Sequence, residues 1–379
     1  MNLQGHLDDE AREVASRYDA GRRSVTCESL GNRGGLSGSR LWRLRVVPPG
    51  AGELVKQPER VGPSEPGPAS ERDQPGEFCL KRWPATHPTR RQLTWIHARL
   101  LLAGSPAEGP LAFVPPPLLT DQGDSLVDWN GHLWELTRWL PGVADFRERP
   151  SRARLRSAGH AIAQLHAGLR HADDLRLDIA PGLLRRWQGL QPGQWNDAKI
   201  AGWRQATQRD EDTERAHTLG AIVEVLPEWH AACLAELPAA LRQPVPLQAC
   251  VRDLWHAHLL FQGDDLTGIV DYGAMQVDSV CADLTRWLGS CVGAEAEGWI
   301  AGLDAYAARR PLTPAEVSIL PAFEMASTLL SAVQWLRWTY DEPRSFEDTG
   351  LARLRQREIL QRLRQGPGTV RELLRQRQV

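Results

Sequence analysis

Two aspartates bracket a short hydrophobic hairpin pattern between Val251 and Gly273. Asp253 lies in a polar loop, and apolar strands are expected at Leu259–Phe261 and Thr267–Val270, with a Gly-Asp-Asp turn between them. The second strand runs into Asp271. A hairpin with one carboxylate before it and one at its exit holds the two acids close together at the same end. Phosphoryl transfer uses such a pair, one acid to orient the nucleophile and one to hold Mg²⁺ on nucleotide phosphates.

Two histidines between these acids allow a second interpretation. His256 and His258 form a His-Ala-His triplet, which by itself suggests the zinc site of a hydrolase together with Asp253 and Asp271. A zinc site built on such a triplet needs further ligands from other strands, and no such set stands out in the sequence. The metal-dependent hydrolase is therefore an alternative and not the main hypothesis.

The chain before the hinge at Thr137–Gly142 is expected to be rich in β-strands. Asn130-Gly131 between two alternating segments is a strong hairpin signal. Pro48–Gly76 is dense in Pro, Gly, Glu and Ser, which predicts a surface insertion outside the core. The expected elements are helices at 7–19 and 88–103 and strands at 25–30, 41–47, 77–83, 111–119, 125–129 and 132–136.

Beyond the hinge the hydrophobic pattern becomes mainly helical. We therefore predict two domains, residues 1–140 and residues 141–379, the second containing the hairpin with the two acids. The expected helices cover 151–170, 180–189, 194–208, 211–237, 282–291, 295–309, 314–340 and 346–363.

Composition narrows the range of partners. A net charge of −2 and a pI near 6.6 argue against a binder of nucleic acid or of an anionic membrane, which needs an excess of basic residues. No Cys-x-x-Cys pair occurs among the six cysteines, so we expect free thiols in a reducing compartment. The N-terminus lacks the pattern of a signal peptide and no long apolar run suggests a membrane span, so a cytoplasmic location is expected.

The spacing of Asp253, His258 and Asp271-Tyr272-Gly273 resembles the catalytic core of the aminoglycoside phosphotransferase/choline kinase family. In that family an Asp is followed by an Asn and then by an Asp-Phe-Gly-type triplet at the same spacing. The resemblance implies an α+β, protein-kinase-like fold with two lobes. The N-terminal lobe would be an antiparallel sheet with one inserted helix, and the C-terminal lobe would be mainly helical with a catalytic β-hairpin.

The resemblance also assigns roles to individual residues. Asp253 would orient the nucleophile, Asp271 would bind Mg²⁺, and Lys81 would contact the nucleotide phosphates unless it is only a lysine on the solvent face of an edge strand. The glycine-rich loop and the hinge would complete the nucleotide site through Gly34, Gly35, Ser37, Trp139 and Leu140. The implied cofactors are ATP or another nucleoside triphosphate with Mg²⁺, or alternatively Mn²⁺. The implied partner is a small-molecule acceptor, with no nucleic acid and no membrane, for a monomer or a homodimer.

Two departures from the family pattern leave alternatives open. His258 replaces the metal-binding Asn, so it could ligate a softer second metal, act through water or on Asp253, or mark the loss of that metal site. The helix after Lys81 has no acid where the family has a Glu, and His97 takes its place. A nucleotide-binding pseudokinase or scaffold protein is therefore the first alternative.

Other residues complete the prediction. We expect His166 to pack as a structural histidine and Asp283 to brace the catalytic loop through hydrogen bonds. The acceptor would bind around residues 170–240, where the charges are mixed, which does not favour a strongly cationic aminoglycoside.

Overall fold

The computed structural model of the chain describes residues 3–18, 25–32, 38–46, 76–103, 111–191, 195–346 and 348–377. Gly34, Gly35, Ser37 and nearly all of the predicted insertion lie outside these residues. The chain divides into two compact units, residues 1–101 with 115–140, and residues 102–114 with 141–379. The predicted α+β, protein-kinase-like fold is confirmed, and the two units are described separately below.

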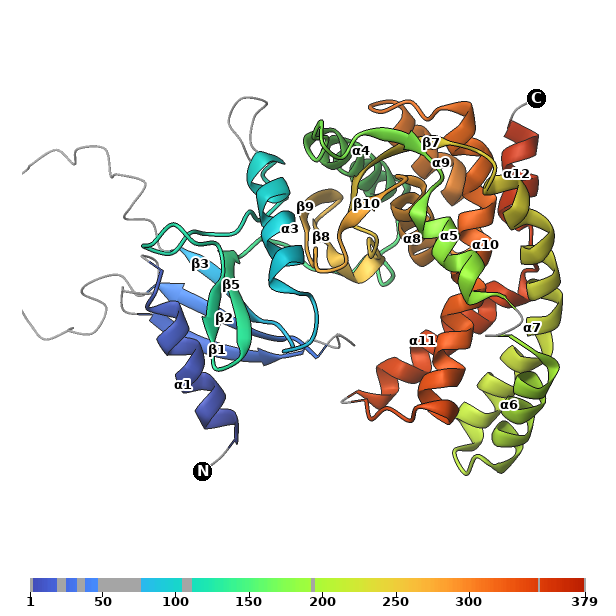
Figure 1. Cartoon of the computed structure of the whole chain (residues 1–379), viewed down its shortest axis with the longest axis horizontal. Helices are drawn as coiled ribbons and strands as arrows, with labels where there is room; N and C mark the ends of the chain where they lie inside the picture. The colour runs from blue at the N-terminus through green and yellow to red at the C-terminus, as the bar shows by residue number, and fades with distance from the viewer. Residues whose placement is uncertain are drawn as a thin grey trace, which may run out of the picture. The chain divides into compact units, whose positions relative to one another are not determined.

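Unit 1 is a five-stranded antiparallel sheet with one helix on each face (Figure 1). Alternate side chains such as Trp42, Leu80 and Leu136 form a buried core with the helix α1. The opposite face carries Lys81 and is contacted by α3 through His97. The strand order is β1-β2-β3-β5-β4, with bounds α1 Leu3–Ala15, β1 Val25–Gly31, β2 Arg40–Val46, β3 Glu77–Arg82, α3 Arg90–Ala103, β4 Val127–Trp129 and β5 His132–Arg138.

The turn between β4 and β5 matches its prediction. Asn130 and Gly131 have φ angles of 50° and 74°, the left-handed values that a two-residue type I′ hairpin requires. The predicted strand from Leu111 to Leu119 is wrong. Prolines at 115–117 lack the N–H that a strand ladder needs, and the segment forms only an isolated bridge between Pro117 and Thr137.

Unit 2 is mainly helical. The long helix α10 packs against α5, α7, α8 and α11, and α4 packs against α9 (Figure 1). Gly159 permits the close approach of α4 and α9, since a Cβ there would lie 2.8 Å from the Cβ of Ala305. The helices are α4 Arg152–Gly168, α5 Pro181–Gly189, α6 Asp197–Arg209, α7 Thr213–Ala240, α8 Cys281–Val292, α9 Ala296–Ala307, α10 Pro314–Leu336, α11 Thr349–Arg364 and α12 Thr369–Arg377.

Three short strands in unit 2 were not predicted from the sequence. In the chain, two of them precede the predicted hairpin and one follows it. They form an antiparallel sheet in the order β10-β7-β6, with β6 at Arg176–Asp178, β7 at Val245–Cys250 and β10 at Gln276–Asp278. The predicted hairpin is present as β8 Leu259–Gln262 and β9 Asp265–Ile269. The last turns of the predicted helix 314–340 are a π-helical segment, Arg337–Asp341, and α12 was not predicted.

The segment Pro314–Asp341 is long and apolar enough to cross a membrane by length and composition alone. However, 72% of its most apolar window is buried inside the structure, which is typical of a core helix.

Candidate active site

The loop that carries Asp253 begins where β7 ends and is held by a single buried carboxylate. Asp283, on α8, accepts hydrogen bonds from the backbone N–H groups of Val251 at 2.8 Å and Arg252 at 2.5 Å. Arg252 has a φ of 67°, a left-handed conformation that is strained for a residue with a side chain. The two hydrogen bonds to Asp283 stabilise this strained turn, so the predicted bracing role of Asp283 is confirmed.

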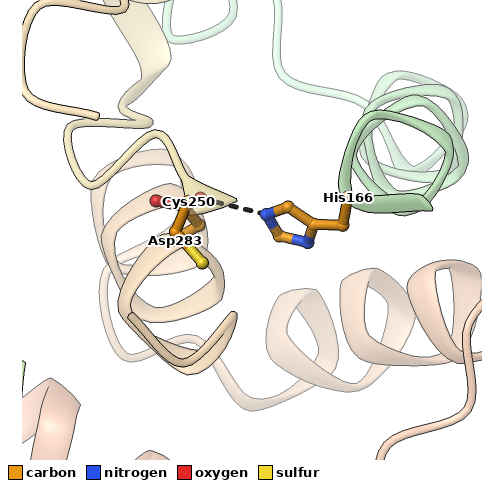
Figure 2. Close-up of side chains that lie close together, drawn as sticks. All are labelled: His166, Cys250 and Asp283. Atoms are coloured by element: carbon orange, nitrogen blue, oxygen red, sulfur yellow. Dashed lines mark hydrogen bonds and ion pairs between the residues drawn. The ribbon is translucent and has the colours of Figure 1, made fainter. Parts of the chain in front are cut away.

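Asp283 is itself fixed by His166, which extends toward it from α4 (Figure 2). His166 Nε2 donates to Asp283 Oδ2 at 3.0 Å, because a carboxylate can only accept, and Nδ1 then accepts from the Tyr306 hydroxyl at 2.8 Å. Both His166 and Asp283 are fully buried. His166 therefore has the structural role that the sequence predicts.

Cys250 lies beside this pair (Figure 2), and the three ligand atoms are within 4.8 Å of one another. The cluster is the one group of three or more metal-ligand side chains found among the described residues. Its hydrogen bonds are already satisfied within the protein, since the thiol donates to the carbonyl of Asp278 at 3.3 Å. Burial raises the pKa of the Cys250 thiol well above its ordinary value, which opposes the thiolate that a metal needs. The cluster is therefore a brace for the loop.

Asp253 is positioned by an arginine that the sequence analysis did not single out. Arg286, on α8, approaches Asp253 Oδ1 with both Nε and Nη2 at 3.0 Å. Among the described residues Oδ2 has no hydrogen-bond partner, and the side chain is 41% exposed. One oxygen is thus fixed while the other is available to a hydroxyl group.

His258 connects the two acids at the base of the hairpin. Its Nδ1 lies 2.8 Å from the backbone carbonyl of Asp253, and its Nε2 lies 3.8 Å from Asp271 Oδ2. Since a carbonyl oxygen only accepts, Nδ1 carries a proton, and in the neutral ring Nε2 holds a lone pair directed to the Asp271 side. The backbone N–H of Val270 donates to the His258 carbonyl at 3.0 Å. The structure thus brings Asp253, His258 and Asp271 together.

Asp271 has a φ of 65° and a side chain that is 37% exposed. Its carboxylate and the Nε2 of His258 form a mixed oxygen and nitrogen donor pair. Two ligands on one metal ion at about 2.1 Å lie roughly 3–3.5 Å apart, so the pair needs only a small adjustment to share a divalent ion. The donor set therefore fits a bound cation, with oxygen for Mg²⁺ and imidazole for a softer ion such as Mn²⁺.

His256 does not join this group. Its ring packs against the Trp255 ring, with 4.4 Å between the centroids and 41° between the planes, and its backbone N–H donates to the Ser290 hydroxyl. Burial and the nearby positive charges of Arg147, Arg355 and Arg286 lower the pKa of His256 to about 3. No three of the four residues of the hydrolase alternative form a cluster of metal ligands in the described part of the chain. The structure therefore does not favour that alternative.

Lys81 lies on β3, an interior strand of the sheet in unit 1, and is only 8% exposed. The interpretation as a solvent-facing lysine on an edge strand is therefore wrong. Its ammonium group lies 3.6 Å from the centroid of the Trp83 ring. Across the ladder it pairs with Glu135 of β5, so the two side chains share one face of the sheet.

Glu135 supplies an acid that the sequence analysis missed. His97 Nε2 lies 2.7 Å from its carboxylate, and His97 Nδ1 lies 2.9 Å from the Ser125 hydroxyl. Burial alone would raise the pKa of Glu135, but the His97 hydrogen bond and the charges of His97 and Lys81 outweigh it and lower that pKa. The histidine on α3 thus holds a strand carboxylate next to the lysine. Only the pairing of β3 with β5 reveals this arrangement, since nothing local in the sequence signals it.

The predicted hinge residues differ in availability. The Trp139 N–H donates to the carbonyl of Glu77 at 2.9 Å, so this donor is not open to a nucleotide base. Leu140 makes no such contact within the part of the chain that the structure describes. The Trp139 ring is covered by the Arg43 guanidinium at 4.4 Å.

Comparison with known proteins agrees with this geometry. The sequence profile of the phosphotransferase enzyme family matches residues 70–317. Homoserine kinase of Agrobacterium fabrum is 24% identical over 220 residues, covering 57% of this chain and 61% of that protein. Homoserine kinase of Methylobacterium nodulans is 27% identical over 235 residues, covering 59% and 64%. The matches thus span less than two thirds of the length of these relatives.

Solved structures share the fold at low identity. An aminoglycoside phosphotransferase from Alicyclobacillus acidocaldarius superimposes with a TM-score of 0.57 at 13% identity, covering 95% of each chain. Spectinomycin phosphotransferase in complex with ADP and spectinomycin gives a TM-score of 0.58 at 10% identity, covering 96% of this chain and 98% of that one. A choline/ethanolamine kinase family protein from Mesorhizobium loti gives 0.53 at 17% identity, covering 97% and 99%.

Proposed function

This chain belongs to the phosphotransferase enzyme family, and we propose that it moves the γ-phosphoryl group of ATP, or of another nucleoside triphosphate, to a hydroxyl group of a small molecule. The observation that carries the proposal is the junction at His258, which contacts the backbone of Asp253 through one ring nitrogen and faces Asp271 with the other. An acid that orients the nucleophile and an acid that binds the metal are the pair that this reaction needs.

Asp253 receives the acceptor hydroxyl on its free oxygen. Arg286 fixes Oδ1, so Oδ2 accepts the hydroxyl hydrogen and directs the lone pairs of the hydroxyl oxygen to the phosphoryl group. A carboxylate is a weaker base than an alkoxide, so its main contribution is orientation, with transfer of the proton late in the reaction. The turn at Arg252, held by Asp283, sets the position of this carboxylate.

Asp271 and His258 are the residues that would hold the divalent cation. The cation supplies neutralisation of charge on the nucleotide phosphates during transfer. Asp271 provides the hard oxygen that Mg²⁺ prefers, while the Nε2 of His258 favours Mn²⁺. Hydrogen bonding of Nδ1 to the Asp253 carbonyl keeps the ring oriented and selects the tautomer in which Nε2 is the ligand nitrogen.

The residues of unit 1 serve the nucleotide. Lys81 neutralises phosphate oxygens, and Glu135 with His97 keeps its ammonium group in place. The N–H of Leu140 is the hinge donor proposed for the base. Gly34, Gly35 and Ser37, outside the described residues, are proposed to cover the phosphates with their backbone N–H groups.

The acceptor is a small molecule with a hydroxyl group. Because the curated relatives are homoserine kinases, hydroxy amino acids such as homoserine come first in a panel of acceptors. We propose that the protein acts in the cytoplasm as a monomer or homodimer, without nucleic acid or membrane partners.

A nucleotide-binding pseudokinase is the second proposal, and the replacement of Asn by His258 is the observation that favours it. Consumption of ATP measured with a broad acceptor panel, in Mg²⁺ and in Mn²⁺, separates the two functions. Turnover with either ion supports the phosphotransferase, and nucleotide binding without turnover in both ions supports the pseudokinase.

Two variants test the assignment of roles. Asp253→Ala is expected to abolish transfer while leaving nucleotide binding intact, because the metal ligands are untouched. Asp271→Ala is expected to abolish the increase in melting temperature that ATP with Mg²⁺ produces. Unchanged turnover in Asp253→Ala would refute the role of this residue, and an unchanged thermal shift in Asp271→Ala would refute the metal site.

A further inference from the structure

Five arginines in unit 2 lie near Asp253 or near Asp278, and they come from four separate segments of the chain. Arg286, on α8, binds Asp253 directly. Arg286 and Arg355 lie over the Trp255 ring, with 5.0 Å and 4.7 Å from the guanidinium carbon to the ring centroid. Arg252 is the residue before Asp253 in the loop. We call the following residues the arginine cluster: Arg185 and Arg186 on α5, Arg252, Arg286, and Arg355 on α11.

Carboxylates neutralise only part of this cluster. Arg185 and Arg252 share Asp278, at 2.9 Å and 3.4 Å, and Arg286 binds Asp253. Five positive charges thus meet two carboxylates in the described ion pairs. Most other partly buried arginines in unit 2 form an ion pair with a separate carboxylate. Arg310 pairs with Glu316, and Arg362 pairs with Glu324. The excess of positive charge is therefore local to the surroundings of Asp253.

Arg186 shows how close together these charges are. Its guanidinium donates only to neutral oxygens, the Ser327 hydroxyl and the Gly182 carbonyl, both at 2.9 Å. Burial, together with the charges of Arg252, Arg185 and Arg286, lowers the pKa of Arg186 to about 10 in spite of Asp278. Arg186 on α5 is therefore close enough to Arg252 and Arg286 for their charges to affect its pKa.

Arg355 contacts the Trp255 ring but no acid among the described residues. Its Nε is buried without a hydrogen-bond partner, and no described residue forms an ion pair with it. Burial and the charge of Arg286 lower the pKa of Arg355, opposed by the more weakly acting Asp253 and Asp348. A buried N–H without an acceptor costs free energy, and a ligand bound at Arg355 can supply the acceptor for its Nε.

We propose that the arginine cluster binds an anionic group of the acceptor, a carboxylate or a phosphate, while the acceptor hydroxyl binds Asp253. This inference rests on the proposed phosphotransfer and assigns a substrate class to it, namely small hydroxy acids or hydroxy phosphates. A planar guanidinium such as that of Arg355 can bind either anion through two parallel hydrogen bonds. The anion would compensate charge that the protein leaves unpaired. A polycationic acceptor would instead be repelled by the same residues.

The unmodified protein provides the first test. Initial rates and calorimetric binding are measured for four compounds with the same three-carbon backbone: glycerate, glycerol 3-phosphate, glycerol and 3-amino-1,2-propanediol. A wider panel of hydroxy acids, sugar phosphates, neutral sugars and aminoglycosides is measured beside them. We expect the best acceptor and the tightest ligands to be anionic, and the carboxylate and phosphate members show which anion is used. A best acceptor that carries neither a carboxylate nor a phosphate overturns the proposal, and so does the absence of anion binding up to about 10 mM.

Variants of Arg355 provide the second test. Arg355→Gln is expected to lower kcat/KM for the best anionic acceptor by about 10- to 100-fold, the usual effect of losing a charge-assisted hydrogen bond, and Arg355→Lys by less. Neutral analogues are expected to change by less than about twofold. The matched control is Arg357→Gln, on the same helix, whose side chain is 52% exposed and pairs with Glu214. Thermal unfolding of each variant shows whether it is folded.

The nucleotide phosphates are the other anion that the arginine cluster could bind. The KM for ATP distinguishes binding of the nucleotide from binding of the acceptor. If Arg355→Gln raises the KM for ATP and leaves the acceptor unaffected, the cluster serves the nucleotide and the proposal is wrong. Equal loss for anionic and neutral acceptors also overturns it, because the role of Arg355 is then structural. Hydrolysis of ATP without acceptor reports on the phosphotransfer itself. Anion binding by calorimetry needs no turnover, so it tests the arginine cluster even if the phosphotransfer fails.

Discussion

Asp283→Asn is the sharpest test of how this protein holds its catalytic loop. The carboxylate is fully buried and accepts three hydrogen bonds, from the backbone of Val251 and Arg252 and from His166 Nε2. An asparagine of the same shape has one accepting oxygen. If that oxygen keeps the two bonds at Oδ2, the amide NH₂ group faces the N–H of Arg252, donor against donor.

The expected cost follows from these three bonds. Two of them lose the negative charge that strengthens them, and the third is lost and leaves a buried N–H unsatisfied. Together these changes amount to about 3–5 kcal/mol in the free energy of unfolding. For a unit of this size the melting temperature should fall by roughly 6–20 °C.

The effect on activity should be larger than the loss of folded protein explains. Without its hydrogen bond the left-handed turn at Arg252 relaxes, and Asp253 moves with it. A displacement near 1 Å can cost about 100-fold, so kcat should fall by at least that much at temperatures where the variant is folded, with little change in the KM for ATP.

The assays are thermal unfolding and steady-state kinetics, with Asp173→Asn as the control because that side chain lies in the same unit and is 80% exposed. A variant that melts earlier but keeps kcat within about twofold would show that Asp283 stabilises the fold without positioning Asp253. An unchanged melting temperature would refute the energetic reasoning itself.

Three further predictions concern Glu135 and His258. Glu135→Gln should raise the KM for ATP by about 5- to 10-fold, because a neutral amide holds the Lys81 ammonium less strongly than a carboxylate; ATP titrations check it, and a KM within twofold of the parent value, roughly, would contradict it. Because folding lowers the pKa of Glu135, the ionised carboxylate stabilises the protein above its unfolded pKa of about 4.3, and this stabilisation is lost as the pH falls through the lower pKa of the folded state. The free energy of unfolding of the Gln variant should therefore depend less on pH, below about pH 4, than that of the parent protein. His258→Asn should shift the ratio of turnover in Mn²⁺ to turnover in Mg²⁺ toward Mg²⁺ by replacing the imidazole nitrogen with an oxygen, and a ratio equal to that of the parent protein would exclude His258 as a metal ligand.

The parts of the site that the sequence predicts are those built by local geometry. A hairpin places its two ends together whatever surrounds it, so the sequence predicted the hairpin that Asp253 and Asp271 flank, and the structure contains it. His258 lies within the same segment, and the structure places it between the two acids. The alternation of apolar residues likewise predicted four strands of the sheet in unit 1 with nearly correct bounds, while β4 was predicted with its end correct and its start two residues early.

The strands in the middle of unit 2 were missed for a reason that also lies in the sequence. β7 is an apolar run that contains Pro246, and β10 has only three residues, so neither shows a period of two that could be recognised. The opposite error at Leu111–Leu119 has the same origin. Apolar residues alone suggested a strand there, and three prolines prevented its ladder.

Two residues to which we assign roles, Glu135 and Arg355, are brought into place by long-range packing. Glu135 acts on Lys81 only because β5 pairs with β3, and Arg355 reaches Trp255 only because α11 packs back onto the helices of unit 2. Neither residue has a sequence neighbour that signals its role. His97 and His258 are the two replacements that suggested an inactive family member. Their contacts in the structure give a different interpretation. His97 holds a strand carboxylate beside the lysine, and His258 contacts the Asp253 backbone and faces Asp271, so both replacements provide contacts that the proposed phosphotransfer can use.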